Sequence, residues 1–380
     1  MKANSVHIWM NFPNSHQSDL FNDLSNQFEN FEVIYAHSDD ENRKNQGWIF
    51  ENNLNYRFKI IDKKLKIWTL IKYVFKNRKS THVVNGIWAE KYFLFVIVLL
   101  NLFGVNFLIY SEAPVPTKNR SIVKRILLNL VIIPSAKLLI IKAKGILAVS
   151  IFAVDFFKSL GIESERIYRF GYFRSIKSNL QKHTISSTIQ LIFVGQLIER
   201  KGIMTLLEAI KNIHQTNKLF NLTIIGTGEL ESILKDFIVE NKLQDTVNLL
   251  GVVSSENVVD YITKADLLIL PSNFDGWGMV VNEALQSNIP VLVSDQCGAK
   301  ELIKYGYNGF IFKAKETDSL TENLLKFLEM SFDERETMKK RAGEMGEKIS
   351  IPVVGNYLNL CIQHSLNPAN LKPTAPWLNE

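Results

Sequence analysis

Between residues 189 and 329 the sequence repeats one pattern, in which a short apolar, β-branched run precedes a segment with helical periodicity. Strands of a parallel sheet are covered by helices on both faces, so they are apolar throughout instead of alternating. The pattern therefore predicts a doubly wound parallel α/β sheet. The runs expected as strands are IQLIFVG, LTIIG, VNLLG, DLLILP, PVLVS and GFIF, and the helices after the last two are AKELIKY (299–305) and SLTENLLKFLE (319–329).

The first half of the chain alternates less regularly, but it also favours an open α/β domain. Its strand candidates are VHIWM, FEVIYA, THVVNG, NFLIYS and ILAVS. A length of 380 residues suits two domains, and the polar, serine-rich segment 175–188 can serve as the linker between them. We expect a first domain at 1–183, a second at 184–355, and a helix or tail at 356–380 that packs back toward the first domain.

Composition narrows the class of protein. Hydrophobic residues make up 46% and charged residues 22%, which excludes a disordered or fibrous chain. Only Cys297 and Cys361 are present, so neither a disulfide framework nor a cysteine-based zinc site is expected, and a reducing compartment fits best. The N-terminus has no apolar run after a basic start, so we expect no secretory signal and a cytoplasmic location.

One apolar stretch, residues 92–110, is just long enough to be a candidate membrane span. Asn101, Gly104 and Asn106 interrupt it. A buried helix at 92–103, a turn and a buried strand at 107–111 explain the stretch equally well, and we favour this second interpretation.

Charge is divided unevenly along the chain. Residues 1–180 hold 25 Lys and Arg against 14 Asp and Glu, whereas residues 181–380 hold 19 against 24. A basic first half indicates an anionic partner. No nucleic-acid-binding module is recognisable, which leaves a membrane surface or a phosphate-bearing substrate. In segment 122–145 lysines alternate with Leu and Ile, as in interfacial segments, but a core helix and strand with solvated lysines would look the same.

Two loops that follow expected strands carry weak signals for phosphate binding. In VGQLIERKGI, Gly195 allows a close backbone turn, and Lys201 places a cation beside a new helix, although Arg200 and Lys201 could simply be solvated loop charges. In IIGTGELES, Gly226 and Gly228 follow a strand. The third glycine of a dinucleotide-binding fingerprint is replaced by Glu231, which argues against a dehydrogenase.

A third loop, LPSNFDGWGMVVNEALQS, is more informative. Asp275 lies on the loop, and Glu283 lies about one turn into the helix that begins near Met279. Free N–H groups at the start of that helix, on Met279 and Val280, suit phosphate oxygens. Without a cation, two carboxylates beside a phosphate are better used to accept hydrogen bonds from sugar and ribose hydroxyls.

This third loop resembles the Glu-x7-Glu signature of the retaining family-4 glycosyltransferases, which have the GT-B fold of two doubly wound Rossmann-like domains facing across a cleft. VGQLIERKG is similar to their GRL…KG loop, and residues 247–272 are similar to the segment between the two motifs. The resemblance covers about residues 189–315 and is specific for the family, but it does not identify the sugar that is transferred.

The resemblance implies a metal-independent, hexosyltransferase-type enzyme without a cofactor, which binds a UDP- or GDP-sugar in its second domain. Lys201 would neutralise the diphosphate, Asp275 would bind the donor sugar, and Glu283 would bind the ribose. The other donor-binding positions that the resemblance implies are Gly195, Gln196, Arg200, Gly226, Gly228, Leu250, Gly251, Val252, Gly278, Met279 and Val280. A front-face mechanism needs no protein nucleophile.

The chain departs from the family pattern at two positions. Asp275 replaces the first Glu and is one methylene shorter, and Gln196 replaces the usual Arg, which removes a cation that Arg200 could supply instead. In the first domain His16, which opens a helix, and Glu112, which follows a strand, are candidate catalytic or acceptor-site residues. A helix-start hydrogen bond and a solvated loop acid are the ordinary alternatives for them.

We therefore expect a retaining glycosyltransferase of surface polysaccharide assembly, whose acceptor is a glycan or is carried on a polyprenyl diphosphate. It would associate peripherally with the cytoplasmic face of the inner membrane. Two alternatives remain open: a GT-B epimerase or hydrolase that acts on a nucleotide-sugar, and a catalytically silent partner of another transferase, which Gln196 would favour.

Overall fold

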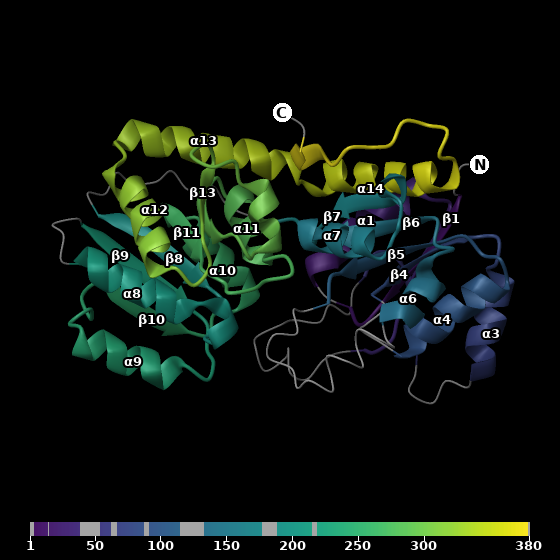
Figure 1. Ribbon diagram of the computed structural model, residues 1–380, viewed down its shortest axis with the longest axis horizontal. Coiled ribbons are helices and arrows are strands. Elements are labelled where there is room, and N and C mark those ends of the chain that lie inside the picture. Colours follow the sequence, from purple (N-terminus) through teal and green to yellow (C-terminus); the bar gives the residue numbers. More distant parts are fainter. Residues whose placement is uncertain are drawn as a thin grey trace. The chain divides into compact units, whose positions relative to one another are not determined.

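A computed structural model describes residues 4–13, 15–38, 54–61, 67–86, 91–114, 133–176, 188–214 and 219–378. The chain divides into two compact units. Unit 1 contains the described residues up to Arg174 together with those from Ile351 onward, and unit 2 contains the described residues of Ser175–Ser350. Each unit is built on one parallel sheet (Figure 1).

Unit 1 has a seven-stranded sheet in the order β3-β2-β1-β4-β5-β6-β7. All of its strand pairs are parallel, and the strand order reverses next to β1, as in doubly wound folds. The strands are β1 (Ser5–Met10), β2 (Asn30–Tyr35), β3 (Arg57–Ile60), β4 (Thr81–Asn85), β5 (Phe107–Glu112), β6 (Gly145–Val149) and β7 (Ile167–Phe170).

Helices cover both faces of this sheet. Residues of α3, α4, α6 and α7 share one buried hydrophobic cluster with the sheet, while α14 packs on α1 and contacts β6. The helices of unit 1 are α1 (Ser15–Gln27), α3 (Ile67–Lys76), α4 (Lys91–Leu102), α6 (Ile133–Ile140), α7 (Ser150–Ser159) and α14 (Ile351–Leu366), with short 3₁₀ helices at Ser164–Arg166 and Pro376–Leu378.

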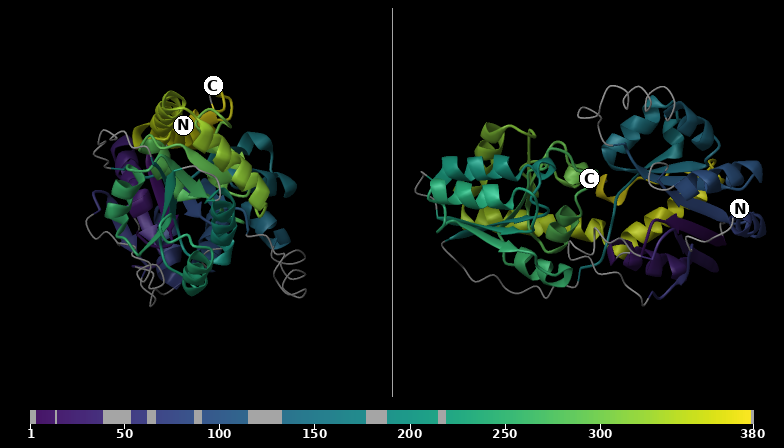
Figure 2. Two further views of the ribbon diagram at one scale, coloured as in Figure 1. Left: turned by 90° about the vertical axis from the view of Figure 1, so that its left-hand side faces the viewer. Right: turned by 90° about the horizontal axis from the view of Figure 1, so that it is seen from below.

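Helix α14 follows unit 2 in the sequence but belongs to the core of unit 1. Figures 1 and 2 show it in yellow along the purple helix α1. The Tyr168 hydroxyl lies 2.7 Å from Nδ1 of His364, and the Tyr357 hydroxyl donates to the carbonyl of Arg169 at 2.9 Å. Gly355 approaches α1 so closely that a Cβ there would lie 2.0 Å from Oδ2 of Asp23.

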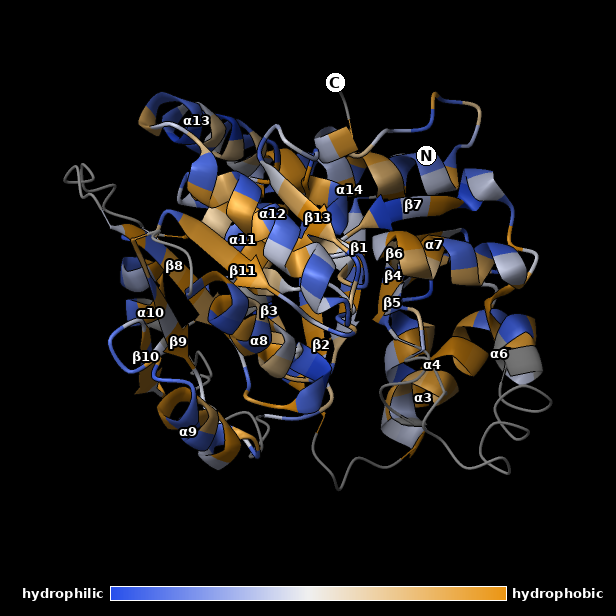
Figure 3. Ribbon diagram, turned by 60° about the vertical axis from the view of Figure 1, so that its left-hand side comes forward, coloured by the Kyte–Doolittle hydropathy of each residue, from blue (hydrophilic) through white to orange (hydrophobic). Residues whose placement is uncertain are grey.

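Unit 2 has a six-stranded parallel sheet in the order β10-β9-β8-β11-β12-β13. Most residues of the strands are apolar, and Figure 3 shows β8 and β11 mainly in hydrophobic colours. They are β8 (Ile189–Val194), β9 (Phe220–Ile225), β10 (Val247–Gly251), β11 (Leu267–Leu270), β12 (Val291–Ser294) and β13 (Gly309–Phe312).

The helices of unit 2 lie on both sides of its sheet. Helices α8, α9 and α12 contribute to one buried cluster with the strands, and α13 packs on α11. A capping box, in which Ser331 and Glu334 exchange side-chain and backbone hydrogen bonds, starts α13. The helices are α8 (Ile203–His214), α9 (Glu231–Glu240), α10 (Ser255–Ile262), α11 (Met279–Gln286), α12 (Thr317–Glu329) and α13 (Phe332–Lys348), with 3₁₀ helices at Glu199–Lys201 and Gly298–Leu302.

Each of the eleven runs expected as strands forms a strand, but two strands and one helix differ from expectation. β3 and β7 were not expected: each has only four residues, and β3 lies at the sheet edge with all four exposed. The helix expected at 299–305 is wrong, because the structure has a 3₁₀ helix at Gly298–Leu302 instead. Its first residues are tied to the loop after β11, since the Gly298 and Ala299 N–H groups donate to the carbonyls of Asp275 and Trp277.

The apolar stretch 92–110 forms α4, a turn and most of β5, which confirms the helix–turn–strand interpretation. Nδ2 of Asn101 donates to the carbonyls of Ile97 and Leu139, whereas its buried Oδ1 accepts no hydrogen bond from the described residues. In the described part of the chain no helix has both the length and the apolar character needed to cross a membrane.

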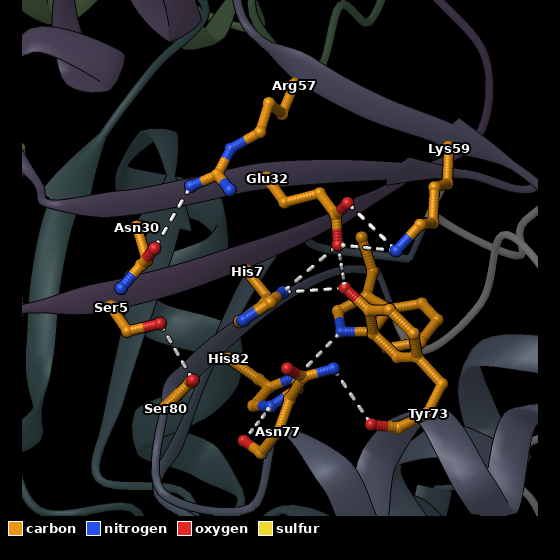
Figure 4. A network of polar contacts seen from close by, with 11 residues as sticks. Ser5, His7, Asn30, Glu32, Arg57, Lys59, Tyr73, Asn77, Ser80 and His82 are labelled. Carbon is orange, nitrogen blue, oxygen red and sulfur yellow. Dashed lines mark hydrogen bonds and ion pairs between the residues drawn. The ribbon is translucent and has the colours of Figure 1, made fainter.

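A polar network lies inside unit 1, between β1, β2, β4 and α3 (Figure 4). The Tyr73 hydroxyl lies 2.6 Å from Nδ1 of His7 and donates to Glu32, which also accepts from Lys59. The Trp9 indole donates to Nδ1 of His82 at 3.0 Å. Burial lowers the pKa of His7 to about 4 and that of His82 to about 3, so both imidazoles are neutral in the folded protein near pH 7.

Candidate functional site

The carboxyl edge of the unit 2 sheet carries most of the residues that the sequence singles out. Strands β8 and β11 are neighbours although two strands separate them in sequence, and the strand order reverses there. In open α/β sheets such a reversal leaves a crevice at the carboxyl ends of the strands, where ligands bind. The loops after β8 and β11 contain Lys201 and Asp275.

The structure brings Lys201 and Asp275 into direct contact. Nζ of Lys201 lies 2.5 Å from Oδ2 of Asp275, and only 15% and 13% of the two side chains are exposed. Because the pair is mostly buried, water screens it less than it would a surface pair. An ammonium group has three N–H donors, so Lys201 can hold Asp275 and still donate to an anionic ligand.

Backbone contacts hold these two loops together. The carbonyl of Arg200 accepts from the N–H of Asn273, and Nη1 of Arg200 donates to the carbonyl of Phe274 at 3.0 Å. Gly202 has φ +67°, and a Cβ there would lie 2.0 Å from the carbonyl oxygen of Pro271. The glycine after Lys201 is therefore required by the approach of the two loops, and Arg200 is engaged with the segment just before Asp275.

The loops after β8, β9 and β10 also lie against one another. The N–H of Gly195 donates to Ile225, and the N–H of Gly226 donates to Gly251. A Cβ on Gly226 would lie 1.9 Å from the carbonyl oxygen of Gly195, and a Cβ on Gly228 would lie 2.4 Å from that of Leu197. Gly195, Gly226 and Gly228 thus form the compact backbone floor of this edge. Of the neighbouring candidates, Gln196 and Leu250 are half-buried and Val252 is exposed.

Helix α11 begins directly after the Asp275 loop. Its N-cap residue, Gly278, has φ +100°, and a Cβ there would meet Sγ of Cys297 at 2.7 Å, so only glycine fits. The first N–H groups of a helix have no acceptor within it, which leaves those of Met279 and Val280 for a ligand. Glu283 is buried one turn further along the helix.

Sequence reasoning missed the role of the loop after β12. Asp275 and Cys297 form an isolated parallel β-bridge. The Asp275 N–H donates to the carbonyl of Gln296, and the Asp275 carbonyl accepts from the N–H of Gly298. Sγ of Cys297 lies 2.8 Å from the carbonyl of Trp277. Burial, and secondly the Asp275 carboxylate, hold the pKa of the Cys297 thiol well above its usual value, so the sulfur stays protonated. The sequence signal that could have indicated this role is the position of the loop directly after an apolar strand.

Together these residues supply the Lys201 ammonium, the mostly buried carboxylates of Asp275 and Glu283, and the first N–H groups of α11, beside the closely packed glycine loops. That combination suits a ligand that carries both phosphate and hydroxyl groups. Among the described residues there is no cluster of three or more His, Cys, Asp and Glu side chains that could hold a metal ion.

In unit 1 the candidate residues lie at the carboxyl edge of its own sheet. Glu112 ends β5 and accepts a hydrogen bond from the Tyr172 hydroxyl at 2.8 Å. The Tyr110 hydroxyl, on the same strand, donates to Gly171 and lies 3.3 Å from Nε2 of Gln17. His16 is in the first turn of α1, but its side chain lies outside the described residues.

The lysine-rich segment 122–145 is described only from residue 133. There it forms α6 and the connection to β6, with Lys137, Lys142 and Lys144 exposed. Leu138 and Ile141 are also exposed, at 73% and 48%.

The second unit is similar in sequence to known proteins. Residues 175–345 match the family model of Glycosyl transferases group 1. The uncharacterized glycosyltransferase MJ1178 of Methanocaldococcus jannaschii is 32% identical over 159 residues, which is 42% of each chain. The amylovoran biosynthesis glycosyltransferase AmsK of Erwinia amylovora is 31% identical over 157 residues, which is 40% of this chain and 39% of that one. The matches thus span about two fifths of each relative.

Structural similarity extends over nearly the whole chain. The crystal structure of HepE from Anabaena in complex with UDP matches with a TM-score of 0.71 at 14% identity, and covers 93% of this chain and 98% of that chain. At this identity the likeness shows the fold alone. It confirms the expected fold class, which is α/β with the two Rossmann-like domains of GT-B proteins.

Proposed function

We propose that the protein is a retaining glycosyltransferase that uses a nucleotide-diphosphate-sugar. The match of residues 175–345 to the family model of Glycosyl transferases group 1 supports this proposal. Unit 2 binds the donor and unit 1 binds the acceptor. The relative that crystallised with UDP supports a nucleotide donor.

The observation that carries this proposal is the buried ion pair between Lys201 and Asp275 at the carboxyl edge of β8 and β11. In the proposed complex, Lys201 donates to the diphosphate while Asp275 keeps its ammonium in position. The carboxylate of Asp275 then also accepts a hydrogen bond from a hydroxyl of the donor sugar. One pair thus links the phosphate and sugar subsites.

Helix α11 supplies the remaining donor contacts. The N–H groups of Gly278, Met279 and Val280 face the diphosphate, and Glu283 accepts from the ribose hydroxyls. These positive groups stabilise the negative charge that the leaving diphosphate acquires, and the proposed reaction uses no metal ion.

In the proposed front-face reaction, the bond between the sugar C1 and the diphosphate oxygen breaks, and a bond from C1 to the acceptor oxygen forms on the same face. The acceptor hydroxyl proton passes to the departing diphosphate. Charge stabilisation by Lys201 and the α11 N–H groups promotes the departure. Glu112 and His16, at the carboxyl edge of unit 1, are proposed to orient the acceptor hydroxyl.

For the acceptor we propose a glycan or a polyprenyl-diphosphate-linked oligosaccharide of a surface polysaccharide. The amylovoran biosynthesis relative supports a polysaccharide pathway. We place the reaction at the cytoplasmic face of the membrane, with the protein held peripherally.

A thermal-shift panel tests the donor site. Purified protein is heated with UDP, GDP, ADP or CMP, each once in the presence of EDTA and once with added Mg²⁺. A ligand at about a hundred times its dissociation constant stabilises the folded state by ~2.7 kcal/mol, which gives a readily measured rise in melting temperature.

We expect one nucleotide to raise the melting temperature and the others to have little effect, which would also identify the base. If no nucleotide shifts the transition, the donor site is refuted and the silent-partner alternative takes its place. A shift that requires a metal ion would refute the metal-independent mechanism.

A further inference from the structure

The amino edge of the unit 1 sheet carries an unusual surface. Three helix–strand connections meet there, those from α3 to β4, from α4 to β5 and from α6 to β6. Figure 1 shows the three helices as neighbours, and both α3–α4 and α4–α6 pack together. We call their exposed residues at this edge the amino-edge patch. It consists of Phe75, Lys76, Arg78, Lys79, Leu102, Leu138, Ile141, Lys142 and Lys144.

Large apolar side chains in the patch are open to solvent. Leu102 and Leu138 are 72% and 73% exposed, and Phe75 and Ile141 are about half exposed. Isolated exposed leucines are common on protein surfaces, but contiguous ones mark an interaction site.

The ends of the three helices that carry the patch are in contact with one another. The rings of Phe75 and Phe103 pack edge to face with centroids 5.5 Å apart, which joins the end of α3 to the end of α4. Nδ2 of Asn101 donates to the carbonyl of Leu139 at 2.9 Å, which joins the end of α4 to α6.

All charged residues in the patch itself are basic. The described residues 67–86, 91–111 and 133–154 include no Asp or Glu, whereas the patch itself contains five Lys and Arg residues. The nearest acidic residues of the described chain include Glu32 on β2, which accepts from Tyr73 of α3, Glu112 at the far end of β5 and Asp155 on α7. The patch therefore combines apolar side chains with positive charge and contains no acidic residue of its own.

The helix dipole explains some of the positive charge in the patch but not its exposed apolar residues. Cations at helix carboxyl ends are stabilised by the helix dipole, which accounts for lysines at the ends of α3 and α6. It does not account for Leu102 and Leu138. A hollow of about 550 Å³ at the same edge is lined by Lys142, Lys144 and Arg166, together with apolar residues and the polar residues Asn101, Asn106 and Ser365. Its three cationic residues suit an anionic headgroup.

We propose that the amino-edge patch docks on the surface of an anionic lipid bilayer. Phe75, Leu102, Leu138 and Ile141 enter the boundary between headgroups and acyl chains, while the lysines contact lipid phosphates. The patch is thus the surface that holds the protein peripherally at the membrane in the proposed function. The inference rests on the proposed function for the biological purpose of docking, but not for the docking itself.

The patch is separate from the proposed acceptor edge of the same unit. Phe107 begins β5 beside the hollow, and Glu112 ends the same strand. At ~3.3 Å per residue, the two ends of this strand lie about 17 Å apart. Changes in the patch should therefore leave binding at the carboxyl edges unaffected.

Vesicle cosedimentation of the full chain, without donor or acceptor, tests the proposal. The vesicles are phosphatidylcholine alone, or phosphatidylcholine with roughly a third phosphatidylglycerol. We compare the wild type with the double variant Leu102→Glu/Leu138→Glu. The matched control is Leu219→Glu/Val239→Glu, which makes the same kind of change at two exposed apolar residues of unit 2.

We expect the wild type to bind the anionic vesicles, to bind neutral vesicles at least tenfold more weakly, and to be released by salt. The patch variant should lose at least tenfold in partitioning, whereas the control variant should match the wild type. Removing Lys142 alone should lower partitioning about fivefold.

Wild-type partitioning in the patch variant would overturn the proposal, and so would equal binding to neutral vesicles. A patch variant that changes the oligomeric state, while the wild type ignores vesicles, would identify the patch as a protein interface instead. The nucleotide thermal shift of each variant checks folding and tests the donor site independently, so failure of the membrane surface and failure of the proposed function give different results.

Discussion

Lys201 and Asp275 are 74 residues apart in the sequence and form one ion pair in the structure. The sequence placed each of them after an apolar strand, and the parallel-sheet rule placed both loops at one edge. Their direct contact was not predictable, because it depends on β8 and β11 being neighbours and on the side-chain positions within two irregular loops. The hydrogen bonds between Asp275 and the loop that contains Cys297 were not predictable for the same reason.

The buried histidines of unit 1 allow a prediction about acid stability. The unfolded chain takes up protons on His7 and His82 near pH 6.5, whereas in the folded state their pKa values are lowered to about 4 and about 3. Between these limits the unfolded state binds more protons. Stability is therefore fully present above about pH 6.5 and is lost as the pH falls toward the folded pKa values.

Urea unfolding at pH 7 and pH 4.5 measures this effect. We expect a loss of about 2–3 kcal/mol for each histidine at the lower pH. The variant His7→Asn/His82→Asn should show a weaker pH dependence, whatever its absolute stability. An equal slope in this variant and the wild type would mean that other groups dominate the acid response.

At the scale of helices and strands, the apolar runs predicted the strands well, because continuous burial leaves a clear signal. β3 gave no such signal, since its four residues are exposed at the edge of the sheet. The segment 299–305 has helix-like composition, but hydrogen bonds to the Asp275 loop hold its start in a 3₁₀ helix. Tertiary contacts of this kind override local preference.

Two glycines of the unit 2 edge provide a matched pair of substitutions. Gly226 and Gly251 both have positive φ, but a Cβ at Gly226 would lie 1.9 Å from the carbonyl oxygen of Gly195, whereas a Cβ at Gly251 meets open space. Gly251→Ala should cost about 1–2 kcal/mol from backbone strain alone. Gly226→Ala should cost more and should also weaken nucleotide binding, because the loops must separate.

Chemical denaturation and nucleotide titration of the two variants check this comparison. Equal destabilisation by both substitutions would show that the close approach of Gly195 and Gly226 adds nothing to the cost of Gly226→Ala beyond backbone strain.

At the scale of the whole molecule, α14 and the described residues after it belong to unit 1, although they follow unit 2 in the sequence. Leu358 is 3% exposed on this helix. Leu358→Ala should destabilise the protein by about 2–5 kcal/mol, since it leaves a cavity in a packed region. Hydrogen exchange should then accelerate in β6, β7 and α1. Acceleration in α11 and β11 instead would show that α14 stabilises the other unit.

The central claim is that the carboxyl edge of the unit 2 sheet binds a nucleotide diphosphate through Lys201. Unit 2 contains a natural control, because Lys339 forms a similar, mostly buried ion pair with Asp266 at 2.8 Å. Asp266 lies just before β11, at the amino edge of the sheet, and its carboxylate accepts from the N–H of Gln190.

Calorimetric titration of UDP and GDP into the wild type, Lys201→Ala and Lys339→Ala tests this claim most directly. We predict that Lys201→Ala and the companion variant Glu283→Ala each weaken binding of the preferred nucleotide by about 1–3 kcal/mol. Lys339→Ala should lower stability and leave the affinity unchanged. Wild-type affinity in both Lys201→Ala and Glu283→Ala would contradict the assignment of this edge as the donor site.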